Sequence, residues 1–160
     1  MTTTRAELES LARHPNVPIL IEDETGTGKT MVARHLHAVS QRVGDFWEVT
    51  LAALEDALAN SDLFGHVRGG FTGAVESRKG FFVSAQHGTI YFDELGKASL
   101  QVQRKLLTAI EQHEIRPVGS DRAASVDVRV IAASNLPLAD AVAAKTFLPD
   151  LYERIQTFGV

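Results

Sequence analysis

Short apolar runs alternate with stretches of helical periodicity along most of the chain. The runs at residues 19–21, 46–50, 89–94 and 126–135 are predicted strands. Their apolar positions follow one another rather than alternating with polar ones, which is typical of strands covered on both faces, as in parallel sheets. Strands separated by helices at this spacing predict an α/β domain with a mainly parallel sheet flanked by helices.

Helical periodicity supports the intervening elements. Residues 5–13 predict a short amphipathic helix that ends before Pro15, because proline disfavours helix in the residue before it. A second helix is expected to face the core with Val32, Leu36 and Val39, which recur at i, i+4 and i+7.

A third helix is expected to begin after Ser99, whose side chain can cap it. Its apolar face comprises Val102, Leu106, Leu107 and Ile110. Residues 115–122 predict a small hairpin, and two short helices are expected at residues 138–143 and 150–155.

Composition and charge exclude several classes of protein. At 160 residues the chain is long enough for one domain, which we place at residues 17–160 after a helical lead-in at residues 1–16. The net charge of −4, with scattered Lys and Arg, argues against direct DNA binding. The chain has no Cys, which is typical of a reducing cytoplasm. No apolar run approaches ~18 residues and residues 1–4 do not resemble a signal peptide, so we expect no membrane contact.

Residues 23–30 have the spacing of a phosphate-binding loop, Gly, four residues, then Gly-Lys-Ser/Thr, except that Asp23 stands at the first Gly position. In such loops, backbone N–H groups and a helix N-terminus surround the phosphates. The predicted nucleotide-binding residues are Asp23, Glu24, Thr25, Gly26, Thr27, Gly28, Lys29 and Thr30. Lys29 would add a cation and Thr30 could ligate Mg²⁺. Alternatively, the stretch is a strand-turn-helix corner with a chance Gly-Lys-Thr.

Asp23 is expected to weaken the loop in two ways. An Asp residue visits the left-handed backbone region at a cost of roughly 1–2 kcal/mol. Its carboxylate also stands between Glu22 and Glu24, and one such charge ~7 Å from a phosphate would repel it by ~2 kcal/mol at an effective dielectric near 20.

Polar residues follow two later strands. Asp93 and Glu94 end one apolar run, and Asn135 ends another. Because ligands of parallel sheets bind beyond the carboxyl ends of the strands, these residues and the Gly-Lys-Thr segment predict a nucleotide hydrolase. Asp93 is the expected Mg²⁺ partner of Thr30, Glu94 would orient or deprotonate the attacking water, and Asn135 would bind that water or the γ-phosphate.

Residues 63–74 contain four Gly in twelve positions, which predicts a loop. Phe71 lies among these glycines without an apolar neighbour at helical or strand spacing. Such a side chain is either tucked back onto the protein or offered to a partner.

The chain resembles the central AAA+ domain of bacterial sigma-54-dependent transcription activators from about residue 17 to residue 160. The most specific match is Leu-Phe-Gly-His and then Gly-Gly-Phe-Thr-Gly-Ala within residues 63–74, which is similar to the Gly-Ala-Phe-Thr-Gly-Ala loop of that family. Residues 88–96 resemble its Walker B segment, residues 128–135 its sensor I strand, and residues 147–155 its arginine-finger stretch.

The resemblance implies a P-loop AAA+ α/β subdomain that binds ATP and Mg²⁺ between subunits of a ring, commonly a hexamer. It also implies remodelling of sigma-54 RNA polymerase through a partner loop, Gly69, Gly70, Phe71, Thr72, Gly73 and Ala74. Arg154 would reach the nucleotide of a neighbouring subunit, and a hairpin at residues 116–128 would line the same pore. The family's helical lid would begin near Val160, so we expect it to be missing from this chain.

Four positions depart from the family pattern. Besides Asp23, Leu148 replaces the first finger arginine, Thr50 replaces an Asn that holds the catalytic Glu in check, and Gly70 replaces Ala, which we expect to be a mild change.

These departures leave three functions open. The first is a sigma-54 remodelling ATPase, with ordinary or with impaired turnover. The second is a catalytically weak or inactive AAA+ module that serves oligomerisation or regulation. The third is a small-molecule P-loop kinase, which would leave the Phe71 loop unexplained.

Overall fold

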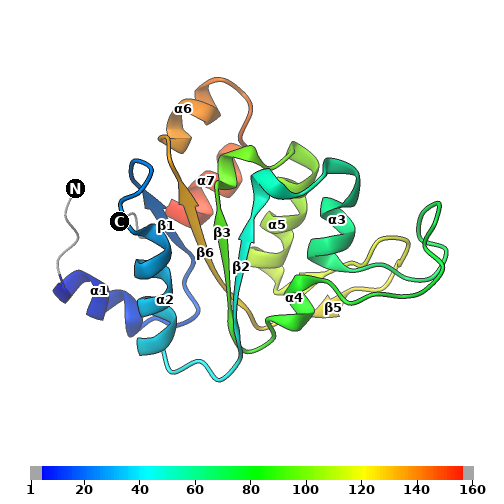
Figure 1. Ribbon diagram of the computed structural model, residues 1–160, viewed down its shortest axis with the longest axis horizontal. Helices are drawn as coiled ribbons and strands as arrows, with labels where there is room; N and C mark the ends of the chain where they lie inside the picture. Colours follow the sequence, from blue (N-terminus) through cyan, green and yellow to red (C-terminus); the bar gives the residue numbers. More distant parts are fainter. Residues whose placement is uncertain (1–4, 157–160) are drawn as a thin grey trace.

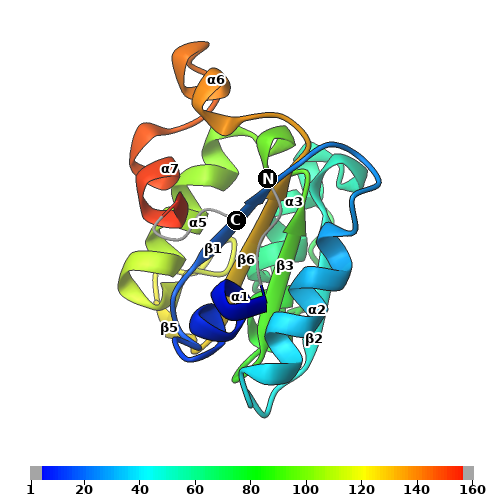
Figure 2. The ribbon, with the colours of Figure 1, turned by 90° about the vertical axis from the view of Figure 1, so that its left-hand side faces the viewer.

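The computed structural model describes residues 5–156 and contains one parallel four-stranded sheet (Figure 1). The strands are β1 (Ile19–Glu22), β2 (Phe46–Thr50), β3 (Thr89–Asp93) and β6 (Arg129–Ser134). They lie in the order β1-β6-β3-β2, which Figure 2 shows from the side of β1. All three strand pairs are parallel, so the predicted α/β class with a parallel sheet is confirmed.

Helices cover both faces of the sheet. They are α1 (Arg5–Ala12), α2 (Lys29–Val39), α3 (Asp56–Phe64), α4 (Phe81–Ser84), α5 (Leu100–Gln112), α6 (Leu138–Ala143) and α7 (Pro149–Ile155), with 3-10 turns η1 (Leu51–Ala53) and η2 (Leu95–Lys97). A small antiparallel hairpin joins β4 (Glu114–Ile115) to β5 (Ala124–Ser125). No helix of residues 5–156 is long and apolar enough to span a membrane.

Side chains of the strands alternate between two core clusters, because successive residues of a strand point to opposite faces. Ile19, Ile21 and Ile131 pack with Leu11 of α1 and Leu36 of α2 on one face. The other face buries side chains of β1, β2, β3 and β6 against α3, α5 and α7. Burial on both faces explains why the strands are almost continuously apolar.

Most predicted elements are confirmed, and their bounds shift by a few residues. The strand at residues 46–50 and the helix at residues 138–143 lie where they were predicted. The Ser99 hydroxyl accepts a hydrogen bond from the backbone N–H of Val102, as expected of a helix cap. The hairpin around residues 115–122 is also present, since β4 and β5 flank that turn.

Three predictions of local structure were wrong or incomplete. Val39 is 39% exposed and does not face the core, because the buried face of α2 runs through Ala33 and Leu36. The last strand begins at Arg129 rather than at Val126. The helices α3 and α4 were not predicted, and α3 has almost no amphipathic signal because its buried positions include Ala59 and Ser61.

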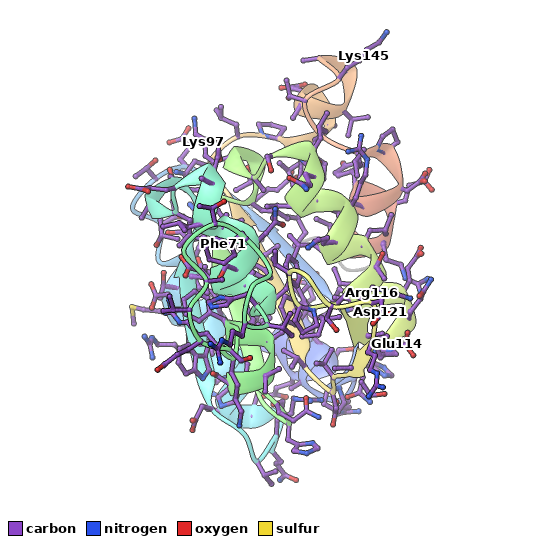
Figure 3. All side chains as sticks on the ribbon, turned by 90° about the vertical axis from the view of Figure 1, so that its right-hand side faces the viewer. Phe71, Lys97, Glu114, Arg116, Asp121 and Lys145 are labelled. Atoms are coloured by element: carbon purple, nitrogen blue, oxygen red, sulfur yellow. The ribbon has the colours of Figure 1, made fainter. Side chains whose placement is uncertain are left out.

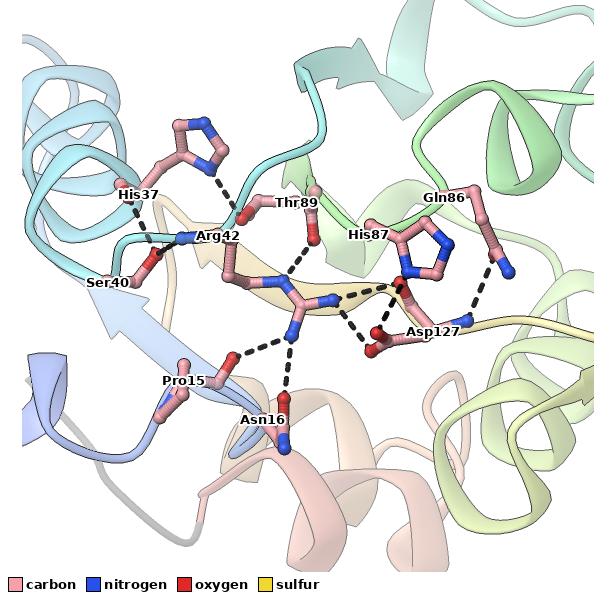
Figure 4. A network of polar contacts seen from close by, with 10 residues as sticks. Pro15, Asn16, His37, Ser40, Arg42, Gln86, His87, Thr89 and Asp127 are labelled. Carbon is pink, nitrogen blue, oxygen red and sulfur yellow. Dashed lines mark hydrogen bonds and ion pairs between the residues drawn. The ribbon is translucent and has the colours of Figure 1, made fainter.

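A polar network lies at the end of the sheet where the strands begin (Figure 4). The Arg42 side chain is only 7% exposed and donates to the Asp127 carboxylate at 2.7 Å. It also donates to the carbonyl oxygen of Gly88 at 2.7 Å and to the side chain of Asn16 at 2.6 Å. Arg42 therefore joins the segments that lead into β1, β3 and β6.

Candidate functional site

The strand order brings the predicted polar residues together at the carboxyl ends of the strands. β6 lies between β1 and β3, so the phosphate-binding loop after β1, Asn135 after β6 and Asp93–Glu94 at the end of β3 follow neighbouring strands. The amide nitrogen of Asn135 lies 3.5 Å from a carboxylate oxygen of Glu94. The prediction that these strand ends converge is confirmed by this geometry.

The loop between β1 and α2 has the backbone of a phosphate cradle. Gly26 and Gly28 have φ values of 84° and 86°, in the left-handed region that favours glycine, and a Cβ atom at either would meet nothing within 4 Å. Lys29 is 8% exposed, and its ammonium donates to the carbonyl oxygens of Asp23 and Glu24 at 2.8 and 2.7 Å. The loop is thus closed around a buried cation, with open space above its glycines, and these features fit a bound phosphate chain.

The conformational cost expected for Asp23 is absent. Asp23 is not among the described non-glycine residues with positive φ, so no left-handed strain arises there. The Asp23 carboxylate is exposed and accepts a hydrogen bond from the backbone N–H of Glu24 at 2.8 Å. What remains of the expected penalty is its charge, which solvent partly screens.

The Glu22 carboxylate also opposes phosphate binding less than the acidic run of residues 22–24 suggests. Its carboxylate accepts a hydrogen bond of 2.6 Å from the backbone N–H of Leu138, the first residue of α6. The side chain therefore fixes α6 to the end of β1 instead of pointing into the phosphate cradle. Sequence distance concealed this role, because 116 residues separate the two partners.

Thr30 and Asp93 remain the residues suited to Mg²⁺. Among residues 5–156, no group of three or more His, Asp or Glu side chains could hold a metal by itself. Mg²⁺ bound here would rely on these two oxygen ligands, phosphate oxygens and water, as this ion commonly does. The Thr30 hydroxyl lies 3.5 Å from the phenol oxygen of Tyr91, and burial raises the pKa of that phenol. Tyr91 was not predicted to take part in the site.

Glu94 has an unusual backbone conformation. Its φ and ψ of 56° and 48° lie in the left-handed region, which costs a non-glycine residue on the order of 1–3 kcal/mol and is often found at functional sites. Asn135 contacts its carboxylate, so Asn135 has a partner in the protein besides the expected water or phosphate. Thr50 pairs with Asp93 across β2 and β3. Thr50, which differs from the family pattern, therefore lies beside the Asp93–Glu94 pair.

Arg154 lies on α7, on the sheet face opposite the helix that begins with Lys29. It is an exposed residue in the last turn of α7, a helix whose Leu151 and Ile155 pack on the sheet face opposite α2.

Gln103 of α5 fixes the start of α7 and was missed by sequence reasoning. Its fully buried amide donates to the carbonyl oxygens of Ala98 and Thr146 at 2.9 and 3.0 Å, and it accepts from the backbone N–H of Leu148 at 2.8 Å. Leu148 thus caps α7 by its backbone, although its side chain carries no charge. The sequence signal for this role was a Gln on the apolar face of a predicted helix, where a buried amide needs hydrogen-bond partners.

The predicted partner loop, residues 69–74, extends from the end of α3 and lies beside the β4–β5 hairpin (Figure 3). Phe71 is 37% exposed, and its ring edge lies against His66 with 5.0 Å between centroids. The side chain is therefore partly tucked back and partly available. In this backbone conformation position 70 has no room for Ala, because a Cβ atom on Gly70 would lie 2.4 Å from the carbonyl oxygen of Val118.

Comparisons with known proteins agree with this geometry. The family model described as the sigma-54 interaction domain matches residues 1–160. The anaerobic nitric oxide reductase transcription regulator NorR of Escherichia coli O1:K1 is 44% identical over 159 residues, which are 99% of this chain and 31% of NorR.

Solved structures show the same fold. NtrX from Brucella abortus in complex with ATP aligns with a TM-score of 0.85 and 31% identity over 98% of this chain and 35% of NtrX. The P-loop NTPase domain of a sigma-54 transport activator from E. coli shares the fold, with a TM-score of 0.66 and 17% identity over 98% of this chain and 89% of that domain. The chain spans about a third of the length of NorR and NtrX.

Proposed function

Because the chain belongs to the sigma-54 interaction domain family, we propose that it binds ATP with Mg²⁺ and couples ATP hydrolysis to remodelling of sigma-54 RNA polymerase. One observation carries the proposal. The Lys29 loop, the Asp93–Glu94 pair and Asn135 follow three neighbouring strands and meet at the carboxyl edge of a parallel sheet. RNA polymerase would be met in the cytoplasm.

Nucleotide binding is assigned to residues 23–30. Lys29 would exchange its two carbonyl acceptors for phosphate oxygens, to which a cation bonds more strongly. Gly26 and Gly28 leave the backbone N–H groups accessible to the phosphates. NtrX, at 31% identity, has been solved with ATP and with ADP, which supports this assignment.

Hydrolysis is assigned to Glu94, with Asn135 as the residue that orients it. A carboxylate can take a proton from the attacking water, and the Asn135 amide limits the directions in which that carboxylate can point. Thr30 and Asp93 would hold Mg²⁺, which neutralises charge on the phosphates. Arg154 would act on the nucleotide of a neighbouring copy in a ring, an assignment supported by its exposed position in the last turn of α7.

Polymerase contact is assigned to the loop of residues Gly69 to Ala74. Phe71 offers a partly exposed aromatic ring at its tip, and aromatic side chains are frequent energetic centres of protein interfaces. The impaired-module alternative loses support, because Asp23 has no backbone strain and Lys29 is fully engaged in the loop.

Equilibrium binding of a fluorescent ATP analogue with Mg²⁺ tests the first step. Lys29→Ala should weaken binding by about 10- to 100-fold, the effect of one or two charge-assisted hydrogen bonds. Asp23→Gly should strengthen binding by a few-fold, since it removes a screened negative charge. Lys97→Ala, which removes an exposed cation after the acid pair, is the matched control and should bind normally. Equal binding by the native chain and Lys29→Ala would refute the proposed site.

Phosphate release by the native chain and by Glu94→Gln tests the second step. Glu94→Gln should retain nucleotide binding and lose at least about 100-fold in turnover, because an amide cannot accept the proton of water. Nucleotide binding without turnover in the native chain would support the regulatory alternative instead.

A further inference from the structure

The helix α6 takes its N-terminal hydrogen bond from another element. Pro137 precedes its first residue, Leu138, and a proline side chain has no oxygen that could accept a backbone N–H. The half-buried carboxylate of Glu22, at the end of β1, accepts the N–H of Leu138 instead, at 2.6 Å. A carboxylate at this end of a helix also interacts favourably with the helix dipole. β1 therefore supplies the cap that the segment before α6 cannot provide.

The turn between β6 and α6 is closed by this bond, and it carries Asn135. On the β6 side, the Ser134 hydroxyl donates to the carbonyl oxygen of Leu136 at 2.5 Å and accepts the N–H of Leu136 at 3.3 Å. Ser134 is also the register partner of Glu22 across β6 and β1. The turn is thus held at its first residue by Ser134 and at its last by Glu22.

Asn135 tolerates little movement of this turn. Its amide nitrogen lies 3.5 Å from a carboxylate oxygen of Glu94, which is about the longest distance at which a hydrogen bond forms. Among residues 5–156, no other group donates a hydrogen bond to the Glu94 carboxylate. A small displacement of the turn would therefore leave that carboxylate free to rotate.

The fold of α6 does not depend on Glu22 alone. Leu138 is 2% exposed and packs in the same core cluster as Leu151 and Ile155 of α7. This apolar contact keeps α6 on the protein when the bond to Glu22 is lost. A substitution at Glu22 should therefore move the turn that carries Asn135 without unfolding the domain.

We infer that Glu22 is a positioning residue for hydrolysis, which sets the direction of the Glu94 carboxylate through α6 and Asn135. Its own carboxylate is engaged by Leu138, and it acts from the end of β1. The kinetic consequence rests on the proposed function, in which Glu94 activates water. The positioning of Asn135 by Glu22 does not rest on it.

Phosphate release and binding of the fluorescent ATP analogue, measured on the 160-residue chain, separate positioning from binding. Glu22→Ala should lower kcat by about tenfold, because a misdirected base loses much of its effect, while affinity stays within about twofold of native. Glu22→Gln keeps a carbonyl oxygen for the Leu138 N–H and should retain at least about half of the native kcat. Native kcat in Glu22→Ala, no rescue by Gln, or a parallel loss of affinity would overturn the inference.

The matched control removes an acid from the same helix. Asp140 is an exposed residue in the first turn of α6, and Asp140→Ala should change kcat by less than about twofold, as expected of an exposed charge. An effect of Asp140→Ala equal to that of Glu22→Ala would show that charge near α6 matters and the Leu138 bond does not.

A double-variant cycle identifies the route of the effect. If Glu22 acts through Asn135, then Glu22→Ala should change kcat little once Asn135 is already replaced by Ala. Fully multiplicative losses of kcat from the two substitutions would show that Glu22 does not act through Asn135.

NMR provides a readout that needs no turnover. In Glu22→Ala, the Leu138 amide should exchange at least about tenfold faster and the side-chain amide signal of Asn135 should shift, while Ile131 of β6 keeps its native exchange rate. Asp140→Ala should leave the Asn135 signal in place. Unchanged exchange at Leu138, or an unmoved Asn135 signal, would overturn the inference. If the native chain releases no phosphate, the assigned hydrolysis fails, and these signals still decide whether Glu22 positions Asn135.

Discussion

Replacing Arg129 with Met should stabilise the protein. Arg129 begins β6 and is 0% exposed, yet among residues 5–156 no carboxylate is a hydrogen-bond partner of its side chain. Burial, and secondly the nearby Arg42 cation, lower the pKa of the Arg129 guanidinium to about 10. A shift of that size corresponds to a penalty on the charged form of about 3 kcal/mol at neutral pH.

The bonds that Arg129 makes recover little of this penalty. It donates to the carbonyl oxygen of Leu11 at 3.0 Å and to that of Leu36 at 3.5 Å, and its Nε has no partner within the part of the chain that the structure describes. Both carbonyls also accept a backbone N–H, from His14 and Ser40 respectively, so neither would be left unpaired. A Met side chain fills a similar volume without charge, and such replacements commonly gain about 1–4 kcal/mol.

Urea unfolding at pH 7, followed by Trp47 fluorescence and circular dichroism, measures the change. We expect Arg129→Met to raise the free energy of unfolding by about 1–3 kcal/mol, and Arg129→Ala to fall below the Met variant by about 2–5 kcal/mol because it leaves a cavity. Arg42→Met is the matched comparison and should destabilise, since Arg42 is paired with Asp127. A Met variant less stable than the native chain by more than about 1 kcal/mol would refute the reasoning.

Three further predictions concern other polar groups that are buried or half-buried. Burial, then Arg42 and Arg129, lower the pKa of His37; below the ordinary value of 6.5 the unfolded chain therefore binds a proton that the folded chain excludes. Stability should fall from pH 7 to pH 5, and His37→Gln should reduce that fall in paired urea titrations; an unchanged slope would contradict the assignment. Gln103→Leu leaves the Leu148 N–H unpaired and should cost about 2 kcal/mol or more of unfolding free energy, whereas Thr108→Ala on the exposed side of α5 should cost much less. Tyr91→Phe removes the hydroxyl beside Thr30 and should raise the Mg²⁺ concentration needed for nucleotide binding by about two- to fivefold, while Mg²⁺-free binding stays unchanged; no shift would exclude a role for the phenol.

Local patterns were sufficient for much of the fold. The apolar runs located β1, β2 and β3 within a residue or two, because strands buried on both faces must be apolar at successive positions. Ser99 was correctly assigned as a cap, since a hydroxyl before an amphipathic helix has few other roles. The helix α3 escaped notice because small and polar residues, Ala59 and Ser61, occupy its buried positions.

Candidate site residues could be named from the sequence, whereas the contacts between them could not. Lys29, Asp93 and Glu94 were proposed as site residues from spacing and from their positions at strand ends. How these side chains are oriented depends on partners far along the chain, such as Asn135 beside Glu94. Such pairs are decided by which strands become neighbours, and a single sequence does not encode that order locally.

The sequence by itself determined that this protein is an α/β domain with a phosphate loop, an acid pair at a strand end and a glycine-rich loop bearing Phe71. Only the tertiary structure decided that β6 lies between β1 and β3, that Glu22 serves α6, and that Gly70 faces Gly119. The physical reason is that periodicity and residue type report the burial and backbone preference of each segment. Strand order, desolvation of charges and contacts without room for a Cβ atom arise only when distant segments pack together.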